Sequence, residues 1–218
     1  MEKKYPHYTR GWTSKSGSSL KERVQRWGWV VVQSPGVVLG FLWWKDRLGA
    51  NPVEALHHGL GRWTLYFLLA TLLVSPLVRW TRWGFLMPAR RTLGLGAFQY
   101  GVLHFGLWAS LDFDWEWAEI MREILERRYI GWGVAALLGM VPLAWTSPSR
   151  AVKLMGGKRW RTLHQLVYFS AGAGSIHFFL KTFPKEGWGA SAPYLMVFFF
   201  LLSLRAFRIR PKPLRPRA

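Results

Sequence analysis

Six stretches of mostly apolar residues recur along the 218-residue chain, separated by short polar and strongly charged segments. Each stretch is about 17 to 20 residues long, which is the length that an α-helix needs to cross the ~30 Å hydrocarbon core of a bilayer. The pattern therefore predicts an all-α fold, a polytopic membrane bundle of about six transmembrane helices. The predicted spans are 27–44, 61–78, 93–111, 129–146, 163–180 and 188–204.

The pattern also divides the chain into three regions. Residues 1–26 are polar and basic and are expected to form a disordered or surface-lying arm. Residues 27–206 form the predicted bundle, and residues 207–218 are a basic, Pro- and Arg-rich tail expected to be unstructured. Gln33, Ser34 and Pro35 interrupt the first span, so a kinked or interfacial helix is an alternative to a full crossing there.

Charge is distributed unevenly between the loops on the two sides of the predicted bundle. One side, with both termini, holds 22 Lys and Arg against two acids, whereas the other side holds eight against nine. Because positively charged loops stay in the cytoplasm, this asymmetry predicts that both termini are cytoplasmic. The net charge of +19 thus encodes topology, and its spread over four segments argues against a nucleic-acid partner. The outer segment 112–128 alternates acids with Trp and Ile and predicts a short amphipathic surface helix.

Two features of the composition narrow the chemistry. The 15 Trp residues are typical of helices anchored at the lipid–water interface. The sequence contains no Cys, which excludes disulfides, iron–sulfur clusters, thiolate zinc sites and cysteine nucleophiles. A metal in this chain is therefore held largely by His, carboxylate or Met.

Five of the six histidines lie in or beside the predicted spans, where ionisable side chains are costly and tend to be functional. His104 and His177 lie in two spans that run in the same direction, ~20 and ~24 Å of helical rise from the basic membrane edge. Since these depths nearly match, the two imidazoles can ligate one iron porphyrin from opposite sides, and glycines and alanines in both spans leave room for it. We therefore predict that His104 and His177 are the axial ligands of a heme that carries electrons.

The other histidines leave alternatives open. His164 lies too close to the basic edge to share that heme, and it either ligates a second heme or bonds a propionate or the backbone. Position 91, the matching place in the third span, is an arginine, which is no iron ligand. His57 and His58 begin the second span and can serve a heme edge, a quinone or nothing, and His7 in the arm is incidental.

Arginines at the membrane edges are candidate partners of heme propionates, with topology and snorkelling as the alternative explanation. They are Arg62, Arg90, Arg91, Arg159 and Arg161.

Several ordered motifs resemble the MsrQ (YedZ) family, the heme-binding membrane subunits of bacterial periplasmic methionine sulfoxide reductase systems. The motifs are Asn51–Leu56 followed by His58 and Gly61-Arg62, Ala89–Leu95 leading to Leu103-His104, Arg128-Tyr129-Ile130, Leu143–Ser147, and Gly157–Tyr168 followed by His177. The resemblance covers roughly residues 30–206.

The resemblance implies a ferric-reductase-like membrane subunit with six spans and b-type heme in the bacterial inner membrane. It implies His104, His164 and His177 as ligands, with one heme expected and a second left open. Substrate chemistry is then expected on a partner, the periplasmic molybdopterin enzyme MsrP, with the quinone pool or a cytosolic flavin reductase as electron donor. FMN is implied by the resemblance alone, and no dinucleotide-binding fingerprint is present in the sequence.

Two other functions remain compatible with the sequence. One is a self-contained transmembrane ferric or quinone reductase that uses the same heme. The other is a helical transporter or assembly factor whose histidines are structural.

Overall fold

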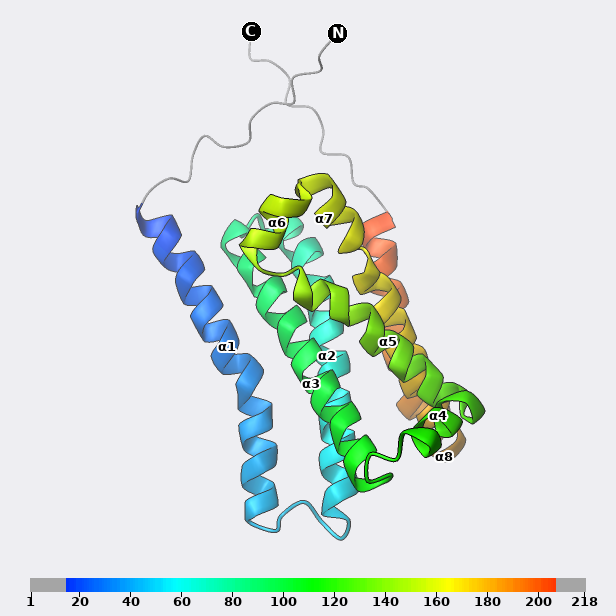
Figure 1. Cartoon of the computed structure of the whole chain (residues 1–218). Helices are drawn as coiled ribbons and strands as arrows, with labels where there is room; N and C mark the ends of the chain where they lie inside the picture. The colour runs from blue at the N-terminus through cyan, green and yellow to red at the C-terminus, as the bar shows by residue number, and fades with distance from the viewer. Residues whose placement is uncertain (1–14, 207–218) are drawn as a thin grey trace, which may run out of the picture. The chain divides into compact units, whose positions relative to one another are not determined.

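A computed structural model describes residues 15–206, which fold into helices and connecting loops without a strand among them (Figure 1). The chain divides into two compact units, one ending at His104 and the other beginning at Phe105. The predicted tail 207–218 and the first 14 residues of the predicted arm lie outside the described residues. Within the arm that is expected to be disordered or surface-lying, residues 15–26 form the first turns of the first helix, which begins at Lys15.

The first unit is built from three long helices that alternate in direction. These are α1 (Lys15–Trp44), α2 (Pro52–Thr81) and α3 (Met87–Leu111), with the short 3₁₀ helix η1 (Gly84–Leu86) before α3. The last turns of α3 belong to the second unit. The helix α2 is antiparallel to α3, because Thr71 meets Gly94 whereas Gly61, earlier in α2, meets His104, later in α3. It also contacts α1, where Gly59 meets Leu39.

The helices α1 and α3 run in the same direction and approach closely through small residues. Gly28 faces Thr92, Gly96 faces Val32 and Gly36 faces Tyr100, so the three contacting pairs share one separation along the chain. A constant separation means that the two helices run parallel. Gln33 and Gln99 lie in the same interface and exchange two amide hydrogen bonds of 3.0 and 3.1 Å.

The interruption at Pro35 is absorbed inside α1, which continues through it. Proline has no N–H to give to the carbonyl of Val31, and the hydroxyl of Ser34 donates to that carbonyl instead, at 2.9 Å. One residue further on, the hydroxyl of Tyr100 is inserted into the helical ladder. It accepts from the Gly36 N–H at 2.6 Å and donates to the Val32 carbonyl at 2.9 Å. Around this interruption α1 is therefore bound to α3, through the side chain of Gln33 and through the backbone of Val32 and Gly36.

In the described part of the second unit, five helices follow the end of α3. They are α4 (Trp117–Glu126), α5 (Arg128–Trp145), α6 (Ser149–Met155), α7 (Gly157–Leu163) and α8 (Leu166–Ala206). The helix α4 is the amphipathic helix expected within 112–128. Its Ile120 is buried, whereas Trp117, Met121 and Leu125 form an exposed apolar stripe at helical spacing.

The long helix α8 is a hairpin of two segments. The backbone leaves helical geometry at Gly187, where φ is 68°, a value that glycine adopts without a steric penalty. The segments then pack against each other in opposite directions, since Phe178 stacks edge-on against Tyr194 and Gly172 meets Phe198. Two of the predicted spans, 163–180 and 188–204, correspond to these two segments.

The helix α5 packs antiparallel to the first segment of α8. Tyr129 near the start of α5 contacts His177, Gly139 meets Ser170, and Thr146 after its end contacts His164. As the residue number increases along α5, the number of the contacting residue in or before α8 decreases, so the two helices run in opposite directions. This packing places both histidines of the second unit against α5 or its end.

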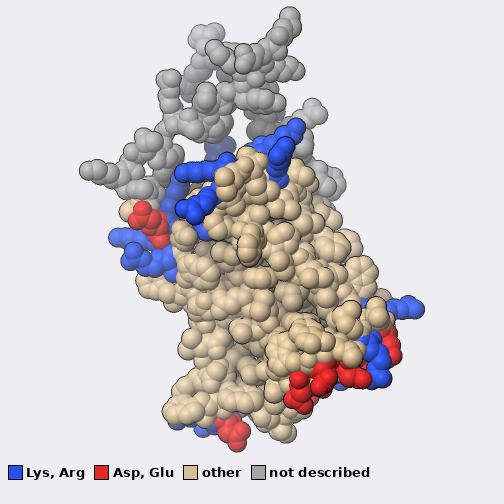
Figure 2. All heavy atoms as spheres, viewed as in Figure 1, with Lys and Arg blue, Asp and Glu red and all other residues tan. Residues whose placement is uncertain are grey.

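Two helical segments are long and apolar enough to cross a membrane, namely α2 and the run Gly157–Arg205. A third crossing results if α5 and α6, which are bent by 86° relative to each other, count as one span. The structure thus supports two to three spans by this criterion, where the sequence predicts six. In α1 and α3, charged residues near the ends, Gln33, Gln99 and several glycines lower the hydropathy. Figure 2 shows Lys, Arg, Asp and Glu near helix ends and uncharged residues over the helix middles.

We expect Tyr100→Phe to destabilise the first unit by about 1–2 kcal/mol, because it removes the bridge between Gly36 and Val32. Thermal unfolding in detergent is expected to shift down by a few degrees. The matched control is Tyr66→Phe on α2, whose side chain is partly exposed and whose ring contact with Trp63 does not need the hydroxyl. Equal stability of Tyr100→Phe and the unaltered protein would contradict the bridge.

Candidate functional site

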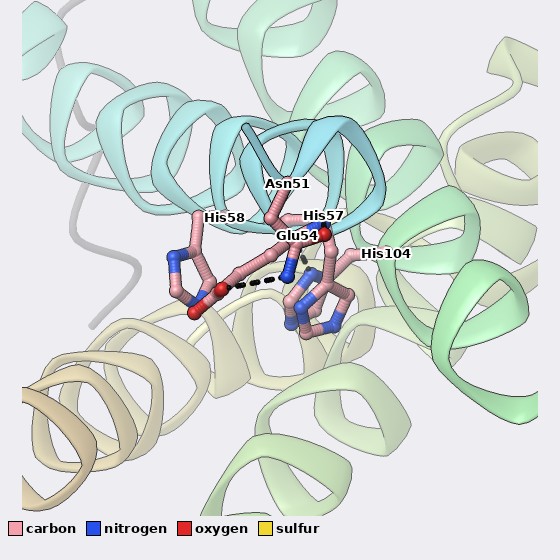
Figure 3. A network of polar contacts seen from close by, with 5 residues as sticks. All are labelled: Asn51, Glu54, His57, His58 and His104. Carbon is pink, nitrogen blue, oxygen red and sulfur yellow. Dashed lines mark hydrogen bonds and ion pairs between the residues drawn. The ribbon is translucent and has the colours of Figure 1, made fainter. Parts of the chain in front are cut away.

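The start of α2 fixes the backbone that meets His104. Asn51 caps the helix, accepting a 3.2 Å hydrogen bond from the Glu54 N–H, and Pro52 occupies the first turn. The amide of Asn51 also donates to the Glu54 carboxylate at 3.0 Å. Asparagine before Pro is a strong helix-start signal, so the sequence itself sets where the first turns of α2 lie. Figure 3 shows the cluster that results, with His57 and His104 side by side.

His104 in α3 is held by His57 of α2 through two contacts. The Nδ1 atom of His104 lies 3.0 Å from the backbone carbonyl oxygen of His57. The two imidazole rings stack with centroids 4.1 Å apart and planes 17° apart (Figure 3). A carbonyl oxygen only accepts, so Nδ1 carries the proton and the lone pair of the neutral ring is on Nε2. An imidazole binds iron through an unprotonated nitrogen, which in this ring is Nε2.

His58 points to another side of α2, where it forms an ion pair of 3.9 Å with Glu54 one turn earlier. Both side chains are exposed to a third or more of their surface. Of the two adjacent histidines, His57 is therefore the one that positions His104. The sequence leaves both histidines open as partners of a heme edge or a quinone, and the contacts with His104 are made by His57.

His177 in the first segment of α8 has a closely similar arrangement in the second unit. Its Nδ1 donates to the backbone carbonyl of Tyr129 in α5 at 2.6 Å, and the Tyr129 ring lies 6.0 Å away between centroids. The proton is again on Nδ1 and the lone pair on Nε2. Two histidines that the sequence predicts as a pair thus share one tautomer, each set by a carbonyl of an antiparallel neighbouring helix.

His164 differs from both. It lies at the break between α7 and α8, and its Nε2 is 3.0 Å from the hydroxyl of Thr146. That hydroxyl donates its one proton to the Pro142 carbonyl at 2.6 Å, so it accepts from His164 and the proton there is on Nε2. Trp160 stacks on the imidazole at 3.9 Å and donates to the Thr146 carbonyl. Residues 147–162 form a basic connection between α5 and α8, here called the basic loop, which contains α6 and α7. In this arrangement His164 holds the basic loop against the end of α5.

The predicted basic partners Arg91 and Arg161 lie far along the chain from His104 and His177, respectively. Arg91 is exposed near the start of α3, 13 residues and thus ~20 Å of helical rise before His104. Arg161 is exposed in α7, one turn before His164. Across residues 15–206, no three His, Asp or Glu side chains gather as a set that could chelate a metal ion.

Sequence reasoning identified the histidines but not the groups that orient them. The two carbonyls that fix His104 and His177 are backbone atoms, and a backbone carbonyl leaves no trace in residue identity. Thr146 lies in the Leu143–Ser147 motif, but the sequence does not show that its hydroxyl contacts His164. The rings of His57 and His58 are equivalent in sequence, and the helical phase of α2 decides between them.

Comparison with known proteins defines the class first. Residues 59–175 match the family model described as the ferric reductase like transmembrane component. That segment begins inside α2, continues through α3 to α7 and ends in α8, two residues before His177. The match and the apolar helices make this chain a membrane protein of the ferric-reductase-like class.

Full-length relatives then define the family within that class. The chain is 38% identical over 179 residues to a heme-binding subunit MsrQ of protein-methionine-sulfoxide reductase from Ralstonia nicotianae, covering 82% of each chain. It is 41% identical to the MsrQ protein of Polaromonas naphthalenivorans, over 78% of this chain and 80% of the relative. A match to the Azospira oryzae protein is 49% identical over 62% of this chain and 58% of the relative. The chain belongs to the MsrQ family.

We expect Thr146→Val to loosen the basic loop, because it removes the acceptor of His164 while keeping the shape of the side chain. Trypsin should cleave the loop after Lys158 or Arg161 several-fold faster than in the unaltered protein. Thr162→Val is the control, since the hydroxyl of Thr162 is exposed and bonds only within α7. Cleavage at an unchanged rate in Thr146→Val would show that the His164 contact does not hold the loop.

Proposed function

We propose that this chain is a membrane electron-transfer subunit that holds b-type heme and delivers electrons to a periplasmic methionine sulfoxide reductase. Family membership supports the class, since the relatives are named as heme-binding subunits of such a system. The observation that carries the proposal is the matched state of His104 and His177. Each donates from Nδ1 to a backbone carbonyl, which leaves the Nε2 lone pair directed away from that bond.

In this proposal His104 and His177 are the two axial ligands. The residues fit a heme better than a chelated ion, because each axial position of a heme iron needs only one imidazole, whereas a chelated ion needs several side chains together. In both rings the hydrogen bond at Nδ1 fixes the orientation and leaves Nε2 as the ligating nitrogen. Bound heme would supply a one-electron carrier buried among apolar helices. The contributions of this chain are to fix two imidazoles, to exclude water around them, and to bring the carrier near its donor and acceptor.

The membrane arrangement is part of the same proposal. Three long helical segments in each unit alternate in direction, which supports six crossings of the bacterial inner membrane with both termini in the cytoplasm. In each unit, the ends that carry most Lys and Arg are those predicted to be cytoplasmic. The acidic α4 then lies on the periplasmic side, where the partner MsrP would dock.

Electrons would enter from the quinone pool or from a cytosolic flavin reductase. FMN remains an expectation from the family resemblance. A second heme ligated by His164 requires that its Nε2 leave Thr146 or that Nδ1 bind the iron, so the contact of 3.0 Å favours one heme. Arg91 and Arg161 are proposed as propionate partners through their position at the basic edge.

Replacing the proposed ligands should remove the heme. We expect His104→Ala and His177→Ala each to lose the low-spin heme absorption of the detergent-purified protein, because a six-coordinate iron needs both imidazoles. His164→Ala should retain it with an unchanged heme-to-protein ratio. Thr64→Ala on α2, whose hydroxyl bonds only within its own helix, is the control for a general loss of folding. Retention of the full spectrum in both ligand variants would refute the assignment.

Electron delivery separates the proposal from a self-contained reductase. With MsrP in substoichiometric amount, the dithionite-reduced protein is expected to be reoxidised to completion and at a high rate when methionine sulfoxide is present, and only in part without it. Stopped-flow absorption of the heme measures this rate. Reoxidation by ferric citrate or a quinone at comparable rates without MsrP would favour the ferric or quinone reductase, and a colourless protein would favour the transporter or assembly factor.

A further inference from the structure

We propose that Gly61 and Gly133 are positioning residues for the two heme ligands, each of them uncovering the backbone carbonyl that fixes the neighbouring imidazole. This inference rests on the proposed heme ligation by His104 and His177. It concerns glycines on helices other than those of the histidines, whereas the sequence points only to small residues on the histidines' own helices.

In the first unit, the edge of the His104 ring lies directly over Gly61 of α2. A Cβ atom at position 61 would be 2.9 Å from Cε1 and 3.1 Å from Nδ1 of His104. Carbon atoms in proteins do not approach this closely without displacement. The carbonyl that accepts from the same Nδ1 belongs to His57, four residues before Gly61 on α2.

The second unit repeats this geometry with different neighbours. A Cβ atom at position 133 of α5 would be 2.8 Å from Nδ1 and 3.0 Å from Cε1 of His177. The carbonyl that accepts from Nδ1 belongs to Tyr129, again four residues before the glycine. The same two ring atoms, the same spacing and the same order along the helix therefore occur twice.

Helix geometry explains why the spacing is four. Side chains in an α-helix tilt toward the N-terminus, so the side chain of residue i+4 covers the surface over the preceding turn, where the carbonyl of residue i lies. That carbonyl already accepts the N–H of residue i+4 and keeps a second lone pair. Glycine at i+4 opens this lone pair to a donor from another helix, whereas any Cβ blocks it.

The residue that provides the carbonyl is free to vary, because only its backbone takes part. It is a histidine in one unit and a tyrosine in the other. Close packing alone does not mark these two glycines, since a Cβ at Gly96 would be 2.4 Å from Val32 and one at Gly139 would be 2.5 Å from Ser170. The same spacing of four occurs at Gly36, where the hydroxyl of Tyr100 donates to the Val32 carbonyl. Among the glycines of the described residues, Gly61 and Gly133 are the ones that an imidazole ring approaches.

The hydrogen bond at Nδ1 has a chemical effect besides orientation. It raises the basicity of the imidazole, which strengthens ligation and favours ferric over ferrous iron. Pushing the ring off its carbonyl should thus weaken heme retention and raise the midpoint potential of the heme that remains.

The test uses the full-length protein purified with its heme, as Gly61→Ala and Gly133→Ala. We expect heme affinity to fall about 10- to 100-fold in each and the midpoint potential of bound heme to rise in a redox titration. Gly106→Ala on α3 and Gly131→Ala on α5 are the controls. A Cβ at Gly106 would have no neighbour within 4 Å, and the nearest neighbour of a Cβ at Gly131 would be 3.4 Å away. Both controls are expected to keep the unaltered heme content and potential.

Unaltered heme content and potential in both Gly61→Ala and Gly133→Ala would overturn the inference while leaving the proposed function intact. A protein without heme before any substitution would instead overturn the proposed function. If the alanine variants do not accumulate, pulsed EPR of the oxidised protein labelled with ¹⁵N-histidine decides. It should show both ligand Nδ1 protons in strong hydrogen bonds, and their absence would contradict the inference.

Discussion

Inside an apolar solvent, every backbone polar group must find its partner within the chain, and this constraint shapes the fold wherever a helix is interrupted. At Pro35 the lost N–H leaves the Val31 carbonyl without its helical donor, and the hydroxyl of Ser34 takes that place. The hydroxyl of Tyr100 enters the next position of the ladder from α3. The repair of one helix thereby becomes the attachment of another.

The same accounting governs the histidines. A ring nitrogen with a proton would be costly among apolar groups, and a carbonyl with a second lone pair accepts it without breaking the helix that owns it. His104 and His177 use this solution, one in each unit. His164 uses a threonine hydroxyl beyond the end of α5 instead, and its ring serves the loop. Which ring nitrogen of each histidine carries the proton thus depends on the hydrogen-bond acceptor that the neighbouring segment provides.

Much of the helical framework could be predicted from the sequence, because apolar length and flanking charge are local properties. The spans predicted at 61–78, 93–111 and 129–146 lie within or within one residue of α2, α3 and α5. The start of the first helix at Lys15 could not be predicted, since residues 15–26 carry no apolar periodicity. His104 and His177 were visible as candidates because they are rare polar residues in apolar spans. The stacking of His57, the Tyr129 carbonyl and the Thr146 contact depend on helical phase and packing, which no single segment encodes.

The reciprocal amide pair of Gln33 and Gln99 has a consequence for how this protein can evolve. Each amide uses the other as both donor and acceptor, so a nonpolar residue at one position leaves the remaining amide without this partner in a half-buried interface. Tolerated change must therefore involve both positions together or a second pair of matching polarity. Because the pair also fixes the register of α1 on α3, a lineage that loses both glutamines must find another way to keep Tyr100 opposite Gly36.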